Sequence, residues 1–469
     1  MLNDMLPLPT AAALPASGGG FWHEVTIRTG IPLPASERLL RGLGWNAAGC
    51  IIGQGASFAG SIVTARYLGK EVFGQLALVQ TTVAAFSTLA GLGLGTTAMK
   101  FVSEHRSQNP RKAGSILGLS TLVAVATAVL FSLVLASCAR WLAPGVESAP
   151  AVISALRLSA PYMFFITVNG YQMGTLSGLE AFRGISYINV AYGLASLGLT
   201  WAFSWRFGFR GAIVSQGFSA ALLWYMYHRA LRVECRRWNI VVTYRGAWSE
   251  RSALYRFSVP TTAAWMISSV AIWWSNTALA RSCGYAELGI FSAATNMRLM
   301  VLFLPLIIGR VTTPMLNNLL AAGELRGYRK TFCGSVILNG GVAVLTASGL
   351  ALVGRSILHA FGKGFTGSPA LILLLLGSAV LEVISGCLYQ AVFTGSSLWP
   401  QVAINGVWAV VLVSTLQFTV SHDGVSALAF SYLAAWSSSM TLYGAEAWRR
   451  LQQLEIRRSR MLEDSLCNR

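Results

Sequence analysis

Twelve apolar stretches of about 20 residues recur along this chain and constrain its fold more than any other feature. A helix needs about 20 mostly apolar residues to cross the hydrocarbon core of a bilayer. Charged residues make up only 11% of the 469 residues and the mean hydropathy is +0.57, which few soluble folds tolerate. We therefore predict an all-α polytopic membrane protein with spans at 44–65, 75–98, 114–137, 151–173, 186–205, 209–228, 257–280, 288–313, 333–353, 369–394, 401–420 and 424–447.

The basic residues predict the orientation of these spans. Of the 35 Lys and Arg, 24 are assigned to one side of the membrane and 8 to the other. Because cytoplasmic loops carry the excess of positive charge, both termini are expected in the cytoplasm. The net charge of +18 thus reflects membrane topology, and no nucleic-acid partner is expected.

A short motif occurs twice, as ARYLGKEVFGQLA at 65–77 and as ARSCGYAELGIFSA at 280–293. Further features recur at nearly the same offset: Arg111-Lys112 with Arg329-Lys330, Tyr171-Gln172 with Tyr389-Gln390, and Ile188-Asn189 with Ile404-Asn405. Six spans therefore repeat as a unit. Since six is even, the two copies enter the membrane in the same orientation, which predicts two pseudo-symmetric lobes with a site between them.

The repeated motif has a local explanation as a turn. Gly69 and Gly284 are expected to take a left-handed helix cap, and Gly74 and Gly289 to let two helices approach closely. We assign these residues no substrate role.

The repeat and the loops divide the chain into five parts. These are a disordered cytoplasmic tail at 1–40, an N-lobe at 41–228, a basic cytoplasmic loop at 229–256, a C-lobe at 257–447 and a basic amphipathic cytoplasmic tail at 448–469. The loop and the C-terminal tail are expected to lie on the anionic inner leaflet.

Three segments resemble bacterial polysaccharide transporters of the Wzx type: ARYLGKEVFGQLALVQ (65–80), AGLGLGTTAMKFVSEH (90–105) and AELGIFSAATNMRLMVLFLPLIIGRVTTPMLNNL (286–319). These flippases belong to the multidrug/oligosaccharidyl-lipid/polysaccharide exporter superfamily. The resemblance implies a V-shaped fold of two six-helix lobes in the bacterial inner membrane. It also implies movement of an undecaprenyl-diphosphate-linked oligosaccharide between leaflets by alternating access, for O-antigen or exopolysaccharide biosynthesis. Polysaccharide polymerase and export machinery are the implied further partners, beside membrane lipids.

Enzymatic motifs are missing from the sequence. The only Asp residues are Asp4, Asp423 and Asp464, and no HExxH, GxSxG or GxxxxGK[ST] occurs. The seven Cys stand singly, without the spacing of a disulfide framework or a zinc site. We expect a transporter with no metal, no cofactor and no ATP motor of its own.

Ionisable residues inside spans are candidates for function because each is costly in hydrocarbon. Arg298, Arg310 and Arg157 are expected to line a cationic cavity that binds the lipid diphosphate, since guanidinium engages phosphate bidentately. The alternatives are a structural pair of Arg298 with Glu382, and snorkelling of the other two to the interfaces. Glu382 is likewise either a site for a coupling proton or cation, or part of a salt bridge.

Polar and aromatic residues in the spans are candidates for sugar contact. Asn169, Trp273 and Trp274 are the ones we assign to it. Interhelical hydrogen bonding explains Asn residues in spans equally well, and an interfacial belt explains most of the Trp residues.

Two other functions compete with the flippase. A multidrug exporter of the same superfamily would, by resemblance, have an acidic residue in its first or seventh span, and 44–65 and 257–280 contain none. A membrane polysaccharide polymerase or ligase would, by resemblance, need a large periplasmic loop with catalytic charge, whereas the outward loops here are short.

Overall fold

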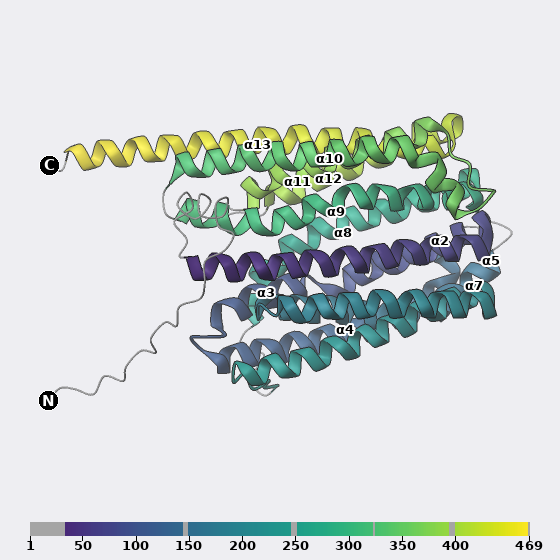
Figure 1. The fold of residues 1–469 in the computed structure, drawn as a ribbon, viewed down its shortest axis with the longest axis horizontal. Coiled ribbons are helices and arrows are strands. Elements are labelled where there is room, and N and C mark those ends of the chain that lie inside the picture. Colours follow the sequence, from purple (N-terminus) through teal and green to yellow (C-terminus); the bar gives the residue numbers. More distant parts are fainter. Residues whose placement is uncertain (1–32, 144–148, 245–250, 322–323, 394–398, 468–469) are drawn as a thin grey trace, which may run out of the picture.

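The computed structural model describes residues 33–143, 149–244, 251–321, 324–393 and 399–467, and it is almost entirely helical there. The helices are α2 (Leu33–Gly91), α3 (Leu94–His105), α4 (Pro110–Leu142), α5 (Ala149–Leu158), α6 (Ala160–Gly178), α7 (Phe182–Arg237), α8 (Arg251–Cys283), α9 (Tyr285–Ala321), α10 (Leu325–Phe361), α11 (Pro369–Phe393), α12 (Trp399–Asp423) and α13 (Val425–Cys467). They run side by side along the long axis of the molecule (Figure 1).

Two of these helices each hold two predicted spans, joined at a glycine. Gly69 interrupts α2 with φ 74°, and Gly208 interrupts α7 with φ 55° and ψ −130°. Glycine adopts positive φ without steric cost, so the chain can reverse there within one residue. Gly284, between α8 and α9, has φ 85°. Both glycines of the repeated turn thus have positive φ, but Gly69, with ψ 169°, does not take the left-handed helix cap that we expected there.

Two predicted spans are broken instead of continuous. The span 75–98 changes from α2 to α3 at Leu92 and Gly93, whose φ values are 44° and 63°. The span 151–173 consists of α5 and α6, which are bent by 44° where Pro161 occupies the first turn of α6. By length and hydropathy, six described helices can cross a bilayer, and the bent pair is a possible seventh: α2, α4, α9, α10, α11 and α12 pass singly.

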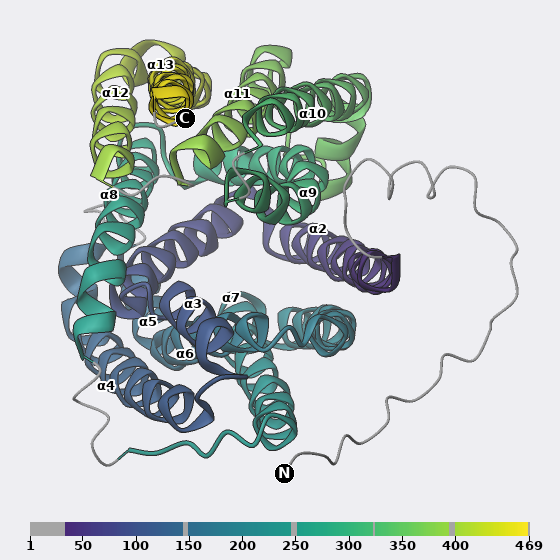
Figure 2. The ribbon, with the colours of Figure 1, turned by 90° about the vertical axis from the view of Figure 1, so that its left-hand side faces the viewer.

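Helices α2–α7 pack together as one lobe and α8–α13 as another, as the end-on view shows (Figure 2). We call them the N-lobe and the C-lobe. Contact between the lobes is made mainly by α2, which packs on both α8 and α9. The predicted exporter fold of two six-helix lobes is thereby confirmed. We call the end of the bundle that holds Gly69 and Gly284 the turn end, and the opposite end the terminal end.

The same side-chain hydrogen bond occurs once in each lobe and confirms the internal duplication of the chain. The Tyr227 hydroxyl donates to Asn189 Oδ1 at 3.4 Å, and the Tyr443 hydroxyl donates to Asn405 Oδ1 at 3.2 Å. Both pairs are 38 residues apart in sequence, so the same contact forms in each copy.

The flanking segments differ in part from expectation. Residues 1–32 of the predicted N-terminal tail lie outside the described residues. The rest of that tail is helical, because α2 begins at Leu33, and Pro34 lies in its first turn, where proline is compatible with a helix. The C-terminal tail is not a separate surface helix, because α13 continues to Cys467 and extends beyond its neighbours (Figure 1).

The described part of the loop between the lobes packs on protein. The Thr243 N–H donates to the Gly114 carbonyl at 3.2 Å. A Cβ built on Gly114 or Gly118 would lie only 1.9 or 2.1 Å from the carbonyl oxygens of 241 and 243, so these glycines of α4 make room for the loop.

Candidate functional site

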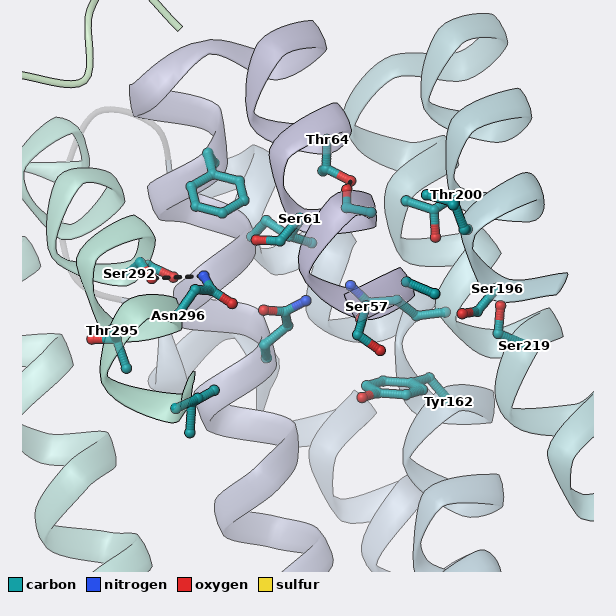
Figure 3. A pocket seen from close by; sticks show the side chains of 18 of the residues that line it. Ser57, Ser61, Thr64, Tyr162, Ser196, Thr200, Ser219, Ser292, Thr295 and Asn296 are labelled. Atoms are coloured by element: carbon teal, nitrogen blue, oxygen red, sulfur yellow. Dashed lines mark hydrogen bonds between the residues drawn. The ribbon is translucent and has the colours of Figure 1, made fainter. Parts of the chain in front are cut away.

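A polar pocket of about 350 Å³ lies where the N-lobe meets α9 of the C-lobe (Figure 3). Four helices line it: α2, α6, α7 and α9. Its walls consist of Ala56, Ser57, Gly60, Ser61, Thr64, Phe73, Leu76, Gln80, Tyr162, Tyr192, Ser196, Leu197, Thr200, Gln216, Ser219, Ser292, Thr295, Asn296 and Leu299.

Helical spacing brings the polar side chains to one face of each helix. On α2, Ser57, Ser61 and Thr64 follow at i, i+4 and i+7. On α7, Tyr192, Ser196 and Thr200 follow at intervals of four, and Gln216 and Ser219 come from the helix after the Gly208 kink. Ordinary α-helical periodicity therefore aligns the polar side chains, and the kinks at Gly69 and Gly208 bring both parts of α2 and of α7 to the pocket.

Much of the hydrogen-bonding capacity of this pocket is not used by the protein. In the described residues, no protein hydrogen bond is made by the side chains of Ser57, Ser61, Gln80, Tyr162, Tyr192, Thr200 or Gln216. Ser219 is only 3% exposed, and its Oγ is buried without a partner. Because buried polar atoms normally have a partner, Ser219 Oγ calls for water or a polar ligand, and the half-buried and exposed groups around it are free to bind the same molecule.

The pocket carries no formal charge among the residues that line it. Its polar groups are hydroxyls and carboxamides, which both donate and accept hydrogen bonds. Tyr162 and Tyr192 add aromatic faces. This chemistry suits a neutral ligand rich in hydroxyl groups better than a cationic or an anionic one.

Aromatic packing closes the pocket on the side of the turn end. Phe73 lines the pocket and lies 6.2 Å from Phe361 and 5.8 Å from Phe365, between ring centroids. Phe58 lies 5.9 Å from Phe361. Beside this cluster, Arg66 Nε donates to the Ala360 carbonyl at 2.6 Å, so both lobes contribute to the closure.

The lobes approach each other closely at Gly74 and Gly289. A Cβ on Gly74 would lie 1.8 Å from the Tyr285 carbonyl oxygen, and a Cβ on Gly289 would lie 2.0 Å from that of Lys70. The close helix approach expected at these two glycines is therefore confirmed, and it occurs between the two copies of the motif.

At the described C-lobe positions that correspond to one wall of the polar pocket, mostly larger and less polar side chains belong to the buried core. The offset of 216 residues set by the Asn189–Tyr227 and Asn405–Tyr443 pairs relates the two lobes. At this offset Tyr192, Ser196, Thr200, Gln216 and Ser219 correspond to Trp408, Leu412, Leu416, Tyr432 and Ala435, which all belong to the buried core. The pocket thus exists where one copy of the repeat has smaller and more polar residues.

Two charged residues from within predicted spans pair with each other inside the C-lobe. Arg298 of α9 forms a salt bridge with Glu382 of α11, and its guanidinium lies 5.1 Å from the ring centroid of Tyr432. Arg298 is 9% exposed and its Nε has no partner. The structural pair considered for Arg298 and Glu382 is therefore present. Neither residue lines the polar pocket.

Of the other two arginines, Arg157 alone has a described side chain, and it does not line the polar pocket. Arg157 is exposed in the last turn of α5, and Arg310 lies in α9, where its side chain is outside the described part of the structure. A cationic cavity made of all three is not formed by the described side chains.

The three residues assigned to sugar contact are engaged in packing. Asn169 donates from Nδ2 to the Ala220 carbonyl at 2.9 Å, and Trp273 donates from Nε1 to Thr82 Oγ1 at 3.1 Å across the lobes. Trp274 packs against the apolar core. None of them lines the pocket, whereas Asn296, one of the other polar residues in spans, does; its Nδ2 donates to the Ser292 carbonyl at 2.9 Å.

Comparisons with known proteins agree with the fold. Residues 39–320 match the family described as polysaccharide biosynthesis protein. An inward-facing multidrug resistance MATE family transporter of the MOP superfamily superposes with a TM-score of 0.72 at 14% identity, over 85% of this chain and 94% of that one.

Two further solved structures have the same fold. A MOP superfamily transporter from Pyrococcus furiosus gives a TM-score of 0.68 at 14% identity, over 88% of this chain and 96% of that one. An outward-facing multidrug resistance MATE family transporter gives 0.64, with the same identity and coverage. No curated protein sequence matches this chain.

Proposed function

Because this chain belongs to the polysaccharide biosynthesis protein family and has the fold of MOP superfamily transporters, we propose that it is a flippase for a lipid-linked oligosaccharide. The cargo would be an undecaprenyl-diphosphate-linked glycan, moved from the cytoplasmic to the periplasmic leaflet of the bacterial inner membrane. The observation that carries this proposal is the uncharged pocket between the lobes, with its unused hydroxyl and carboxamide groups.

The pocket supports a glycan as the group it binds. A sugar presents many hydroxyl groups that both donate and accept, and Ser, Thr, Tyr and Gln side chains can satisfy both roles. Site groups that hydrogen-bond a substrate hydroxyl discriminate strongly, because they are left unpaired when it is missing. We assign head-group binding to Tyr162, Tyr192, Gln216, Ser219 and Asn296.

The proposed orientation places the terminal end in the cytoplasm. The excess of Lys and Arg supports it. The phenylalanine cluster and the glycine contact at the turn end would then close the periplasmic side, which corresponds to an inward-facing state.

The buried ion pair is the part of the molecule that we assign to coupling. Protonation of Glu382 would weaken its bond to Arg298, and on α9 Arg298 lies one turn from the pocket residue Thr295 and next to the pocket residue Leu299. A change at the pair can therefore reach the pocket through one rigid helix. Release of Arg298 would also supply a cation for the lipid diphosphate of the cargo.

The competing function is export of drugs by the same fold. Cationic drugs favour carboxylates, and the residues lining the described pocket include none. The absence of acidic residues from 44–65 and 257–280 points in the same direction.

Deletion of the gene and complementation test the proposal. The deletion strain is expected to retain lipid-linked glycan on the cytoplasmic leaflet, and the wild-type chain to restore export. Gln216→Leu should fail to restore it. Gln417→Leu makes the same change at an exposed position of α12 outside the pocket and should succeed. Normal export by Gln216→Leu would refute the assignment of the pocket, and normal export by the deletion strain would refute the flippase.

A further inference from the structure

A second cavity, of about 280 Å³, lies where α2 breaks into α3. It is formed between the lobes, because α8 of the C-lobe closes it against α2, α3 and α6 of the N-lobe. Its lining is Ser87, Thr88, Gly91, Gly93, Leu94, Gly95, Thr96, Ile166, Thr167, Gly170, Tyr171, Thr262 and Trp265.

The hydroxyl groups around this cavity are mostly bonded to their own helices. Ser87 and Thr88 donate to the Ala84 carbonyl at 3.0 and 2.9 Å, Thr96 donates to that of Gly93 at 2.8 Å, and Thr167 donates to that of Met163 at 2.9 Å. Thr262 is the exception, since its Oγ1 is enclosed without a partner.

The remaining lining is apolar or lacks a side chain. Leu94, Ile166 and the indole of Trp265 stand beside four glycines, and none of the lining residues is charged. Leu92, Trp265 and Met266 are 37%, 58% and 38% exposed, so apolar side chains also surround the cavity. Its chemistry is the opposite of that of the polar pocket.

The cavity and the polar pocket are neighbours along two shared helices. On α2 the pocket ends at Gln80 and the cavity begins at Ser87, a rise of about 10 Å at 1.5 Å per residue. On α6 Tyr162 faces the pocket and Ile166 the cavity, one turn further, or about 6 Å. A molecule with a polar head and an apolar chain can therefore occupy both.

We propose that the second cavity binds a segment of the polyprenyl chain of the cargo while its glycan occupies the polar pocket. This inference rests on the proposed function. The proposed occupant is the prenyl chain and not a membrane phospholipid. Only a chain that is covalently attached to the head group gains affinity when that head group is bound in the adjoining pocket. Apolar burial in a cavity without charges provides the attraction.

Filling the cavity tests the proposal. Gly170 and Gly91 are helical, and no atom lies within 4 Å of a Cβ built on either, so a larger side chain enters open space. Gly170→Leu and Gly91→Leu should lower photolabelling of α3, α6 and α8 by a diazirine-bearing C55 polyprenyl diphosphate by about tenfold or more. Gly349→Leu, on an exposed face of α10 with equally free space, should label like wild type.

A variant that changes the charge of the cavity instead of filling it controls for misfolding of the glycine variants. Trp265→Arg places a charge on an exposed lining residue and should lower the same labelling, with size-exclusion chromatography confirming a folded chain. Labelling of Gly170→Leu and Trp265→Arg at the wild-type level would overturn the inference. So would equal labelling of wild type by a diazirine-bearing diacyl phospholipid that the polyprenyl diphosphate does not displace.

The flippase proposal fails by a different result. The flippase is tested by export in the deletion strain, and Gln216→Leu tests the polar pocket alone. If Gln216→Leu is inactive while Gly170→Leu labels normally, only the chain-binding cavity is refuted.

Discussion

Gly74 and Gly289, related by the internal repeat, face each other across the lobe boundary, where each leaves room for a carbonyl oxygen of the other helix. The contact is reciprocal: Gly74 meets the Tyr285 carbonyl and Gly289 meets that of Lys70, with the same spacing in both copies. Reciprocal contact of this kind is the property of a two-fold axis. The pseudo-symmetry axis therefore passes between these glycines at the turn end.

Alanine at either glycine should weaken this closure. The added methyl group of Gly74→Ala would overlap an oxygen 1.8 Å away, and that of Gly289→Ala one 2.0 Å away. Overpacking of this kind typically costs about 1–3 kcal/mol. We expect a lower unfolding temperature in detergent for both variants. Gly349→Ala, at an open position, is the control, and unchanged melting of both interface variants would contradict the prediction.

Transplanting C-lobe residues into the N-lobe should fill the polar pocket while preserving the fold. Ser196→Leu with Gln216→Tyr reproduces the residues found at 412 and 432, which pack in the C-lobe core. We expect the double variant to insert and melt like wild type but to lose export. The matched control introduces the same residue types outside the pocket, as Ser414→Leu with Gln417→Tyr on α12. Export by the pocket variant at the control level would show that the pocket is not used.

The general architecture could be predicted because it depends on local and periodic features. Apolar stretches of bilayer length, the duplicated ARYLG and ARSCG turns, and the even number of spans per copy lead directly to two lobes. Gly69 and Gly284 were predictable from conformational freedom alone.

The pocket could not be predicted from residue types, because Ser, Thr, Asn and Gln in spans serve packing as often as ligand binding. Asn169 and Trp273 have the chemistry of a sugar site, yet the structure uses them for hydrogen bonds between helices and between lobes. Ser196 and Gln216 are polar in the same way, but the side chains around them leave a cavity beside them. Comparing the two repeats position by position, with Leu412 and Tyr432 as the reference, was the signal that could have revealed them.

Cys235 gives a test of packing outside the spans. It is 7% exposed on α7, and burial, together with the nearby Glu234 carboxylate, raises the pKa of its thiol to about 11. A raised pKa keeps the thiol protonated at neutral pH, and only the thiolate reacts quickly with maleimides. With Cys235 as the single cysteine, N-ethylmaleimide should react very slowly at pH 7.4, and faster as the pH rises toward 11.

The exposed Cys333 provides the comparison for this measurement. A variant that retains only Cys333 should react faster at pH 7.4 than one that retains only Cys235. After denaturation the two rates should converge. Equal rates in the folded proteins would show that the α7 extension does not pack as described.

The Arg298–Glu382 pair can be separated into structural and functional parts by a double-mutant cycle. Arg298→Met leaves the Glu382 carboxylate without its partner in the C-lobe, and removal of one member of a buried pair costs about 3–5 kcal/mol. Arg298→Met with Glu382→Leu removes both charges, so its thermal stability should recover toward wild type. If the pair also couples transport, the double variant should be stable and inserted yet inactive in export. A double variant no more stable than Arg298→Met would contradict the structural role of the pair. A stable double variant with normal export would exclude both residues from transport, because neither charge of the pair would then remain.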